Sequence, residues 1–316
     1  VTFDYVDDVV LTSVSPSVGP SSGGTTLRLV GSGFVFSPNL RVRFGLHSVP
    51  ATYVSATEIS CVTQASDGGD VSLSVSNNGV DYSSTTVQYT YRAVARVTSI
   101  APQGGSVDGG TVVLVTGSDF VDSGSLACKF GDAAASAATF VSATSVRCVA
   151  PSGSSGSVAV EVSNNGADFT KDSVQFRYHA SAAVSSLAPG SGPVSGGTVI
   201  TVHGFNFVDS DALYCRFGGD GAGVTARWIS SSKVECVAPA HALGSVSVEV
   251  TLNDADYTDD GISFTFVKDV LLTSIVPAAG PAGGDTLVTL SGSFVLNLII
   301  TVVLDPQSSL ALCLTA

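Results

Sequence analysis

Several residue types are scarce in this chain of 316 residues, and each shortage excludes a class of function. Met is absent and Trp occurs once, so the chain has no Met-rich groove and no cluster of Trp side chains for binding. Lys and Arg number only 13 against 26 Asp and Glu, which gives a net charge of −13. Because phosphate contacts dominate the affinity of nucleic-acid-binding proteins, we expect no nucleic-acid partner.

Long apolar runs are also missing. The longest, residues 294–304, is interrupted by Asn297 and Thr301 and stops at Asp305. A membrane span requires about 18 continuous apolar residues, so none is expected in this segment. The first residues alternate like a strand and do not form a signal peptide. No Asn-x-Ser/Thr sequon occurs, although the plentiful Ser and Thr could carry O-linked glycan.

One sequence motif occurs four times along the chain. It begins with "SVSP", "SIAP", "SLAP" and "SIVP", and the spacings of the final Pro are 102 − 16 = 86, 189 − 102 = 87 and 277 − 189 = 88. A Gly-rich turn and a β-branched run follow each Pro. The turn residues are Gly23, Gly24, Gly109, Gly110, Gly196, Gly197, Gly283 and Gly284. Such periodicity predicts a tandem array of one structural unit.

Within each unit, short runs alternate between apolar and polar residues. In "VAVEV", for example, Val158, Val160 and Val162 share one face. About seven strands in about 86 residues predict an all-β fold of immunoglobulin-like sandwiches. Asn78-Gly79 and Asn165-Gly166 predict two-residue type I′ hairpin turns. Aromatic residues that recur at fixed positions predict a shared core: Phe34, Phe120, Phe207, Phe44, Phe130 and Phe217.

The repeat sets the expected domain boundaries. Residues 1–9 match the last strand of an upstream repeat, and 10–93, 94–180 and 181–268 are three full repeats. The linkers at 91–97 and 178–184 are short and poor in Pro and Gly, so we expect the sandwiches to stack end to end as a rod. Residues 269–316 form a partial, divergent fourth repeat without the Cys-x-Phe-Gly text. Either the sequence is cut short or misread there, or its tail pairs with another chain as a donated strand.

The pattern Pro, Gly-Gly-Thr, Gly-x-x-Phe, then "CKFG" or "CRFG", then "CVAP", resembles the IPT/TIG domain (immunoglobulin-like, plexin, transcription factor) over residues 12–294. The resemblance implies an immunoglobulin-like sandwich of the E-set type that supplies spacing, dimer contacts or protein binding. Tandem arrays in this family imply an extracellular or cell-surface protein. The DNA-contacting members need a basic loop, which is missing here.

Six cysteines fall into two matched pairs and two single residues. Cys128 and Cys148 in repeat 2 correspond to Cys215 and Cys236 in repeat 3, which favours two intradomain disulfides and an oxidising compartment over buried thiols. Repeat 1 has Val42 in place of the first cysteine, so Cys61 has no partner. We favour a buried thiol for Cys61; the alternative is a bond to another chain or to Cys313.

A search for catalytic, cofactor and metal sites assigns no residue to any of them. "GPSSG" at 19–23 matches Gly-x-Ser-x-Gly, but a strand follows where the nucleophile elbow needs a helix. The four His lack partners at metal-ligand spacing, and "NDADYTDD" at 253–260 is better interpreted as a solvated acidic hairpin than as a Ca²⁺ site. Trp228 could bind sugar, although a packing role is favoured.

These observations favour a non-enzymatic extracellular structural protein without cofactors. It would be a tandem rod that builds a surface filament, coat or adhesive stalk, with other copies of itself or other surface proteins as partners. Two alternatives stay open. One is the ectodomain of a receptor or adhesin that binds a protein ligand through sandwich-end loops, and the other is an accessory region of a carbohydrate-active protein.

Overall fold

The computed structural model describes residues 8–219, 221–281 and 289–293. All regular elements in these ranges are β-strands, and the described residues contain no helix suited to crossing a membrane. The chain divides into two compact units, Val1–Ala180 and Ser181–Ala316. Cys313, Gly283, Gly284, most of the predicted upstream strand at 1–9 and all of 294–316 lie outside the described residues.

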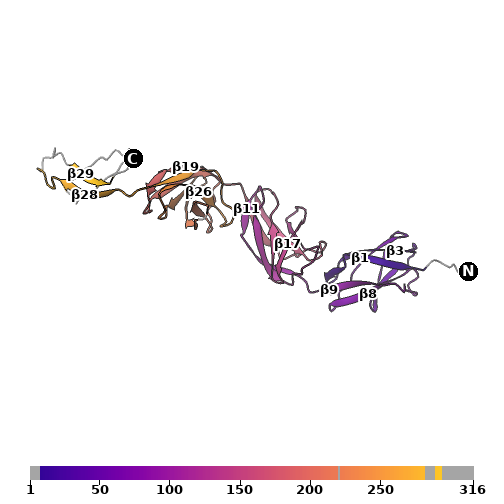
Figure 1. Ribbon diagram of the computed structural model, residues 1–316. Helices are drawn as coiled ribbons and strands as arrows, with labels where there is room; N and C mark the ends of the chain where they lie inside the picture. Colours follow the sequence, from indigo (N-terminus) through magenta and orange to yellow (C-terminus); the bar gives the residue numbers. More distant parts are fainter. Residues whose placement is uncertain (1–7, 220, 282–288, 294–316) are drawn as a thin grey trace, which may run out of the picture. The chain divides into compact units, whose positions relative to one another are not determined.

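Repeat 1 contains nine strands in two mainly antiparallel sheets (Figure 1). One sheet has the order β1-β3-β7-β6 and the other the order β2-β9-β8-β4-β5, with β2 parallel to β9. The chain passes from the first sheet to the second at Pro16, between β1 and β2. The strands are β1 (Val10–Ser15), β2 (Val18–Pro20), β3 (Thr26–Ser32), β4 (Arg41–Phe44), β5 (His47–Pro50), β6 (Thr52–Ser55), β7 (Glu58–Val62), β8 (Gly69–Ser76) and β9 (Val87–Arg92).

Repeats 2 and 3 reproduce this topology strand for strand. Repeat 2 has the orders β10-β12-β16-β15 and β11-β18-β17-β13-β14, and repeat 3 the orders β19-β21-β25-β24 and β20-β27-β26-β22-β23. The strands of repeat 2 are β10 (Arg96–Ala101), β11 (Gly104–Ser106), β12 (Val112–Ser118), β13 (Ala127–Phe130), β14 (Ser136–Ala137), β15 (Thr139–Ser142), β16 (Ser145–Val149), β17 (Gly156–Ser163) and β18 (Val174–His179).

Repeat 3 is built from β19 (Ala183–Ala188), β20 (Ser191–Pro193), β21 (Val199–Phe205), β22 (Tyr214–Phe217), β23 (Val224–Thr225), β24 (Arg227–Ser230), β25 (Lys233–Val237), β26 (Gly244–Thr251) and β27 (Ser263–Val267). A further antiparallel pair, β28 (Leu271–Val276) and β29 (Thr289–Ser293), follows. The expectation of about seven strands per repeat is therefore too low. The first strand is split between the sheets, and the edge is made of two short strands instead of one.

Each sandwich encloses its own apolar core. The inward-facing positions of the alternating runs are buried, as Val160 and Val162 illustrate with no exposed surface. The six recurring Phe are all buried, which confirms the core predicted from their fixed positions. Edge-to-face contacts join three of these rings, Phe44, Phe130 and Phe217, to aromatic residues of the last strand. The centroids of Phe130 and Phe176, for example, are 5.3 Å apart. Each such pair stabilises the fold by about 1 kcal/mol beyond what the burial of apolar surface contributes.

The Gly-Gly turn after each Pro has a steric cause that differs between its two glycines. Gly23 has φ +72°, and a Cβ there would lie 2.5 Å from the carbonyl carbon of Gln64. Gly24 has φ +90° but open space around it. The first glycine is thus required by both conformation and close approach, and the second by conformation alone. Gly109 and Gly196 repeat the first situation.

Two disulfides each join the two sheets of one sandwich. Cys128 on β13 bonds to Cys148 on β16, with their Cα atoms 5.9 Å apart, and Cys215 bonds to Cys236 with Cα atoms 6.3 Å apart. In repeat 1, Val42 and Cys61 occupy the matching positions on β4 and β7, and both are buried. Cys61 is a free, buried thiol. Repeat 1 therefore lacks the covalent link that repeats 2 and 3 have.

Candidate interaction site between repeats 1 and 2

Within the unit Val1–Ala180, a loop of repeat 2 contacts the turn that opens repeat 1. The Thr25 hydroxyl donates a hydrogen bond to Asp168 Oδ2 over 2.7 Å, and Asn165 Nδ2 donates to the carbonyl oxygen of Val18 over 2.9 Å. Thr25 is fully buried, and Asn165 and Asp168 are half-buried. A hydrogen bond to a charged acceptor contributes about 1.5–3 kcal/mol, so this contact has the strength to hold two neighbouring repeats together.

The loop owes its shape to one asparagine side chain. Asn165 Oδ1 accepts hydrogen bonds from the backbone N–H groups of Ala167 and Asp168, at 3.0 and 2.8 Å. Its Nδ2 also donates to Asp168 Oδ2 over 2.7 Å, which fixes the carboxylate that meets Thr25. This is an Asx-type turn, in which a short polar side chain replaces a backbone acceptor. The loop reaches its docking geometry without help from the neighbouring repeat.

The predicted type I′ hairpins at Asn78-Gly79 and Asn165-Gly166 are wrong. A type I′ turn needs positive φ at both residues, and here Gly79 and Gly166 have it but the two Asn do not. The strands on either side also end earlier than a two-residue turn allows: β17 ends at Ser163 and β18 starts at Val174. The asparagine side chain stabilises a longer loop, and that loop is the part of repeat 2 that makes the contact.

The same loop is built in all three repeats. Asn78 Nδ2 donates to Asp81 Oδ2 over 2.8 Å in repeat 1, and Asn253 Nδ2 donates to Asp256 Oδ2 over 2.8 Å in repeat 3. The backbone N–H of Asp81 donates to Asn78 Oδ1 over 2.9 Å, as that of Asp168 does to Asn165. The acidic text "NDADYTDD" is thus partly an Asx turn, which accounts for Asn253 and Asp256.

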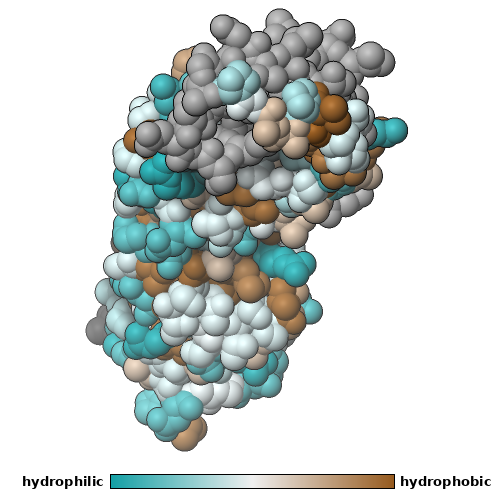
Figure 2. Space-filling view, turned by 90° about the vertical axis from the view of Figure 1, so that its left-hand side faces the viewer, coloured by the Kyte–Doolittle hydropathy of each residue, from teal (hydrophilic) through white to brown (hydrophobic). Residues whose placement is uncertain are grey.

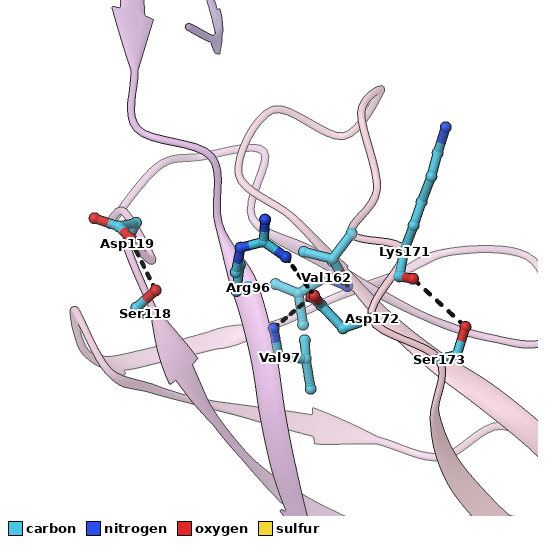
Figure 3. A network of polar contacts seen from close by, with 9 residues as sticks. Arg96, Val97, Ser118, Asp119, Val162, Lys171, Asp172 and Ser173 are labelled. Carbon is cyan, nitrogen blue, oxygen red and sulfur yellow. Dashed lines mark hydrogen bonds and ion pairs between the residues drawn. The ribbon is translucent and has the colours of Figure 1, made fainter. Parts of the chain in front are cut away.

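A second polar contact ties the end of this loop to the first strand of its own repeat. Asp172 Oδ2 accepts from the backbone N–H of Val97 over 2.7 Å, and Asp172 Oδ1 lies 3.2 Å from the guanidinium of Arg96 (Figure 3). Thr85 and Asp260 cap Leu11 and Val184 in the same way in repeats 1 and 3. The loop is therefore anchored at both ends. In Figure 3 the Lys171 side chain points away from Asp172.

A cleft of about 530 Å³ lies beside the contact. Its walls come from the opening turn of repeat 1, from residues 92–96 between the repeats and from the loop of repeat 2. The charged side chains along it are Arg92, Arg96, Lys171, Asp168 and Asp172. Basic and acidic groups alternate, so the cleft has no strong preference for one sign of charge.

Ser21, the serine of "GPSSG", lies in the turn after β2, where no helix follows among the described residues. The described residues hold no group of three or more His, Cys, Asp or Glu that could bind a metal ion. Trp228 is 38% exposed on the edge strand β24, and its indole N–H donates to the carbonyl oxygen of Phe207 over 3.2 Å. Its polar group is thus used in packing.

Behind Thr25 lies Tyr89, whose buried hydroxyl lies near those of Thr25 and Thr63 without a well-formed hydrogen bond to either. Repeats 2 and 3 have Phe176 and Phe264 at this position. An unsatisfied buried hydroxyl costs about 1–3 kcal/mol. We therefore expect Tyr89→Phe to stabilise repeat 1 by about 1 kcal/mol. This change in stability is measured by urea unfolding, with alkylation of Cys61 as the probe of unfolding and Tyr53→Phe as the control. A loss of stability would mean that the hydroxyl has a partner.

Repeat 1 is also expected to be the alkali-sensitive repeat. Burial raises the pKa of Cys61 to about 12 and that of Tyr91 to about 12, from ordinary values of 9.0 and 10.0. Because the folded state holds these protons more tightly, their contribution to the free energy of unfolding of repeat 1 is fully present below pH 9. It is then lost as the pH rises towards 12, at about 1.4 kcal/mol per pH unit for a fully buried group. Alkylation of Cys61 should accelerate above pH 9 more steeply than that of a free thiol. Parallel curves would refute the prediction.

Sequence analysis missed the residues of this contact, although two signals were present. The Asn-x-x-Asp spacing recurs at 78–81, 165–168 and 253–256, and a Thr follows the Gly-Gly pair at 25, 111 and 198. Neither signal alone indicates that the two features meet. Their meeting depends on the linker, which brings the loop end of repeat 2 to the turn end of repeat 1.

The fold defines the chain as a tandem array of immunoglobulin-like sandwiches, of which repeats 1 and 2 are joined by the contact described above. The IPT/TIG domain family matches residues 10–91, 95–178 and 182–266, and the chain belongs to this family. Mouse fibrocystin-L is 28% identical over 297 residues, which is 91% of this chain and 7% of that protein. Human plexin-A3 is 26% identical over 64% of this chain and 11% of that protein.

Among solved structures, the extracellular region of plexin A4 matches 87% of this chain and 26% of that one, with 19% identity and a TM-score of 0.42. The chain thus spans only a small part of the relatives that it matches.

Proposed function

We propose that this chain is a non-enzymatic extracellular segment whose tandem sandwiches form a rod within a surface filament, coat or adhesive stalk. The hydrogen-bonded contact between repeats 1 and 2 carries this proposal. A loop already held by Asn165 presents Asp168 to the buried hydroxyl of Thr25, so ordering this contact costs little entropy. The linker between the repeats is short, which keeps loop and turn at a high effective concentration.

The disulfides support an extracellular location, because such bonds persist in oxidising compartments. They also suit a segment that transmits tension, since each bond joins the two sheets of its sandwich. The IPT/TIG relatives support the same assignment, as plexins and fibrocystin-L match this chain along most of its length.

A second candidate is a receptor or adhesin ectodomain that binds a protein through its loops. Its support is the exposure of large apolar side chains on loops of repeat 1: Phe36 is 80% exposed and Val80 is 77% exposed. Asn77 joins these two loops, because its Nδ2 donates to Gly33 and its Oδ1 accepts from Val35. On the face shown in Figure 2, hydrophobic residues form small patches among neutral and polar ones.

Electron microscopy of the chain, together with its mass in solution, separates the two candidates. Ordered filaments or lateral arrays support the structural proposal. Isolated rods at monomer mass refute assembly by the chain itself and favour a ligand-binding ectodomain. Glycan binding by the chain would instead support an accessory region of a carbohydrate-active protein.

A further inference from the structure

The loop of repeat 1, residues 77–82, has the same build as the docked loop of repeat 2 but is not docked among the described residues. Both loops have the Asn–Asp hydrogen bond and the two backbone N–H groups that donate to the asparagine oxygen. Asn165 and Asp168 are half-buried against repeat 1, whereas Asn78 and Asp81 are exposed. Repeat 1 thus presents on an exposed loop the same donor and acceptor that hold repeat 2 to its neighbour.

The sequence before repeat 1 has the register of a preceding sandwich. The last strand of repeat 1 buries Tyr89 and Tyr91, and residues 86 positions earlier are Phe3 (89 − 86) and Tyr5 (91 − 86). Six positions separate Tyr5 from Leu11, as six separate Tyr91 from Val97, where the next repeat begins. A tether of equal length places a preceding turn as close to loop 77–82 as the turn of repeat 1 is to loop 164–169.

We propose that loop 77–82 is a docking surface for the Gly-Gly-Thr turn of a further IPT/TIG repeat that precedes repeat 1. Asp81 accepts a hydrogen bond from the threonine hydroxyl of that turn. Asn78 donates to the carbonyl oxygen that corresponds to that of Val18. This inference rests on the proposed tandem array and assigns the contact that joins its members.

A tethered repeat fits this surface better than a free partner does. Two hydrogen bonds form a contact far smaller than the about 1,200 Å² that stable association of separate proteins requires. A short linker supplies an effective concentration in the millimolar range, at which such a contact forms. The geometry therefore points to a neighbour in the same chain.

The test adds a preceding repeat to the chain, in place of residues 1–7. Residues 94–180 are fused directly ahead of Asp8, which keeps the natural spacing because Ser181 and Asp8 hold equivalent linker positions. Hydrogen exchange of the backbone N–H groups of Val80 and Asp81 is compared between the original and the lengthened chain. We expect exchange in the lengthened chain to slow by about tenfold, because opening the loop must then also break the docking contact.

Matched variants assign the effect to the contact. Asp81→Ala in the lengthened chain should return peptide 77–82 to its fast exchange. Asp168→Ala at its original position, and not in the added repeat, should speed exchange only at 164–169 of that original copy. Asp132→Ala, on an exposed turn after β13, should change neither peptide. Asp81→Ala in the original chain measures how far the loss of the Asn78–Asp81 hydrogen bond alone speeds exchange of peptide 77–82. The effect of Asp81→Ala in the lengthened chain is corrected for this contribution.

Equal exchange of peptide 77–82 in both chains would overturn the proposal, as would slow exchange that Asp81→Ala leaves in place. Formation of the additional Cys128–Cys148 disulfide shows that the added repeat has folded, and residues 181–268 serve as a second donor if it has not. Filament formation in the microscope does not depend on this experiment, so the failure of one proposal is distinguishable from the failure of the other.

Discussion

Replacing Val42 by Cys is expected to give repeat 1 a third disulfide and to raise its free energy of unfolding by about 3 kcal/mol. Val42 and Cys61 occupy the positions that Cys128 and Cys148 occupy in repeat 2, and both side chains are buried between the two sheets. The Cα separations of 5.9 and 6.3 Å at the two existing bonds lie within the usual range for a disulfide. Closing a loop of about 20 residues restricts the unfolded chain, which is the source of the gain.

Hydrogen exchange of repeat 1 peptides in increasing urea measures this change, and intact mass shows whether the bond has formed. The reciprocal variant Cys128→Val recreates the Val–Cys pair of repeat 1 in repeat 2 and should cost that repeat about 3 kcal/mol. A reducing agent should cancel the gain from Val42→Cys and leave repeat 1 slightly less stable than with Val42, because the thiol fills less of the core than the valine side chain. A variant that forms the bond but gains nothing would show that the sandwich is strained by it.

The sequence was sufficient to predict the architecture because every repeat carries the same buried pattern. Alternating residues such as Val160 and Val162 face the core, and the recurring Phe120 and Phe130 fill it. Repetition strengthens this inference, since a position that is aromatic in every repeat has a common structural cause. The loop at Asn165 escaped prediction for the opposite reason: Asn-Gly is a strong local signal for a hairpin, but the side-chain hydrogen bonds of the asparagine select a longer loop.

The candidate site was harder to predict than the fold because it is formed by two repeats. Asp168 and Thr25 are 143 positions apart, and nothing in either local sequence indicates the other. The buried hydroxyl of Tyr89 was likewise hidden, because Tyr and Phe are equivalent in an apolar pattern. Trp228 is similar: the matching edge positions are Tyr53 and Phe140, so it belongs to a recurring aromatic position instead of being unique.

Gly117→Ala is expected to destabilise repeat 2 by about 3 kcal/mol, at the upper end of what overpacking costs. A Cβ at this position would lie 1.9 Å from the carbonyl oxygen of Arg96 and 2.7 Å from the ring of Phe120. Strand β10 shifts its register against β12 between Val97 and Ser99, which brings the backbone of Arg96 onto Gly117. Backbone and a buried ring cannot both move aside, so the strand pair or the ring must be displaced.

Gly110→Ala is the matched control, because Gly110 has φ +87° but no atom within 4 Å of a Cβ. Conformational strain alone should cost about 1–2 kcal/mol there. Urea unfolding of repeat 2, with hydrogen exchange as the probe, should therefore show that Gly117→Ala is clearly less stable than Gly110→Ala. Gly31 and Gly204 face the same approach of a carbonyl oxygen, at 2.1 Å each, so the larger loss should recur in repeats 1 and 3. Equal losses for the two variants would show that backbone conformation, and not the space beside the strand, requires glycine in the Gly-x-x-Phe motif.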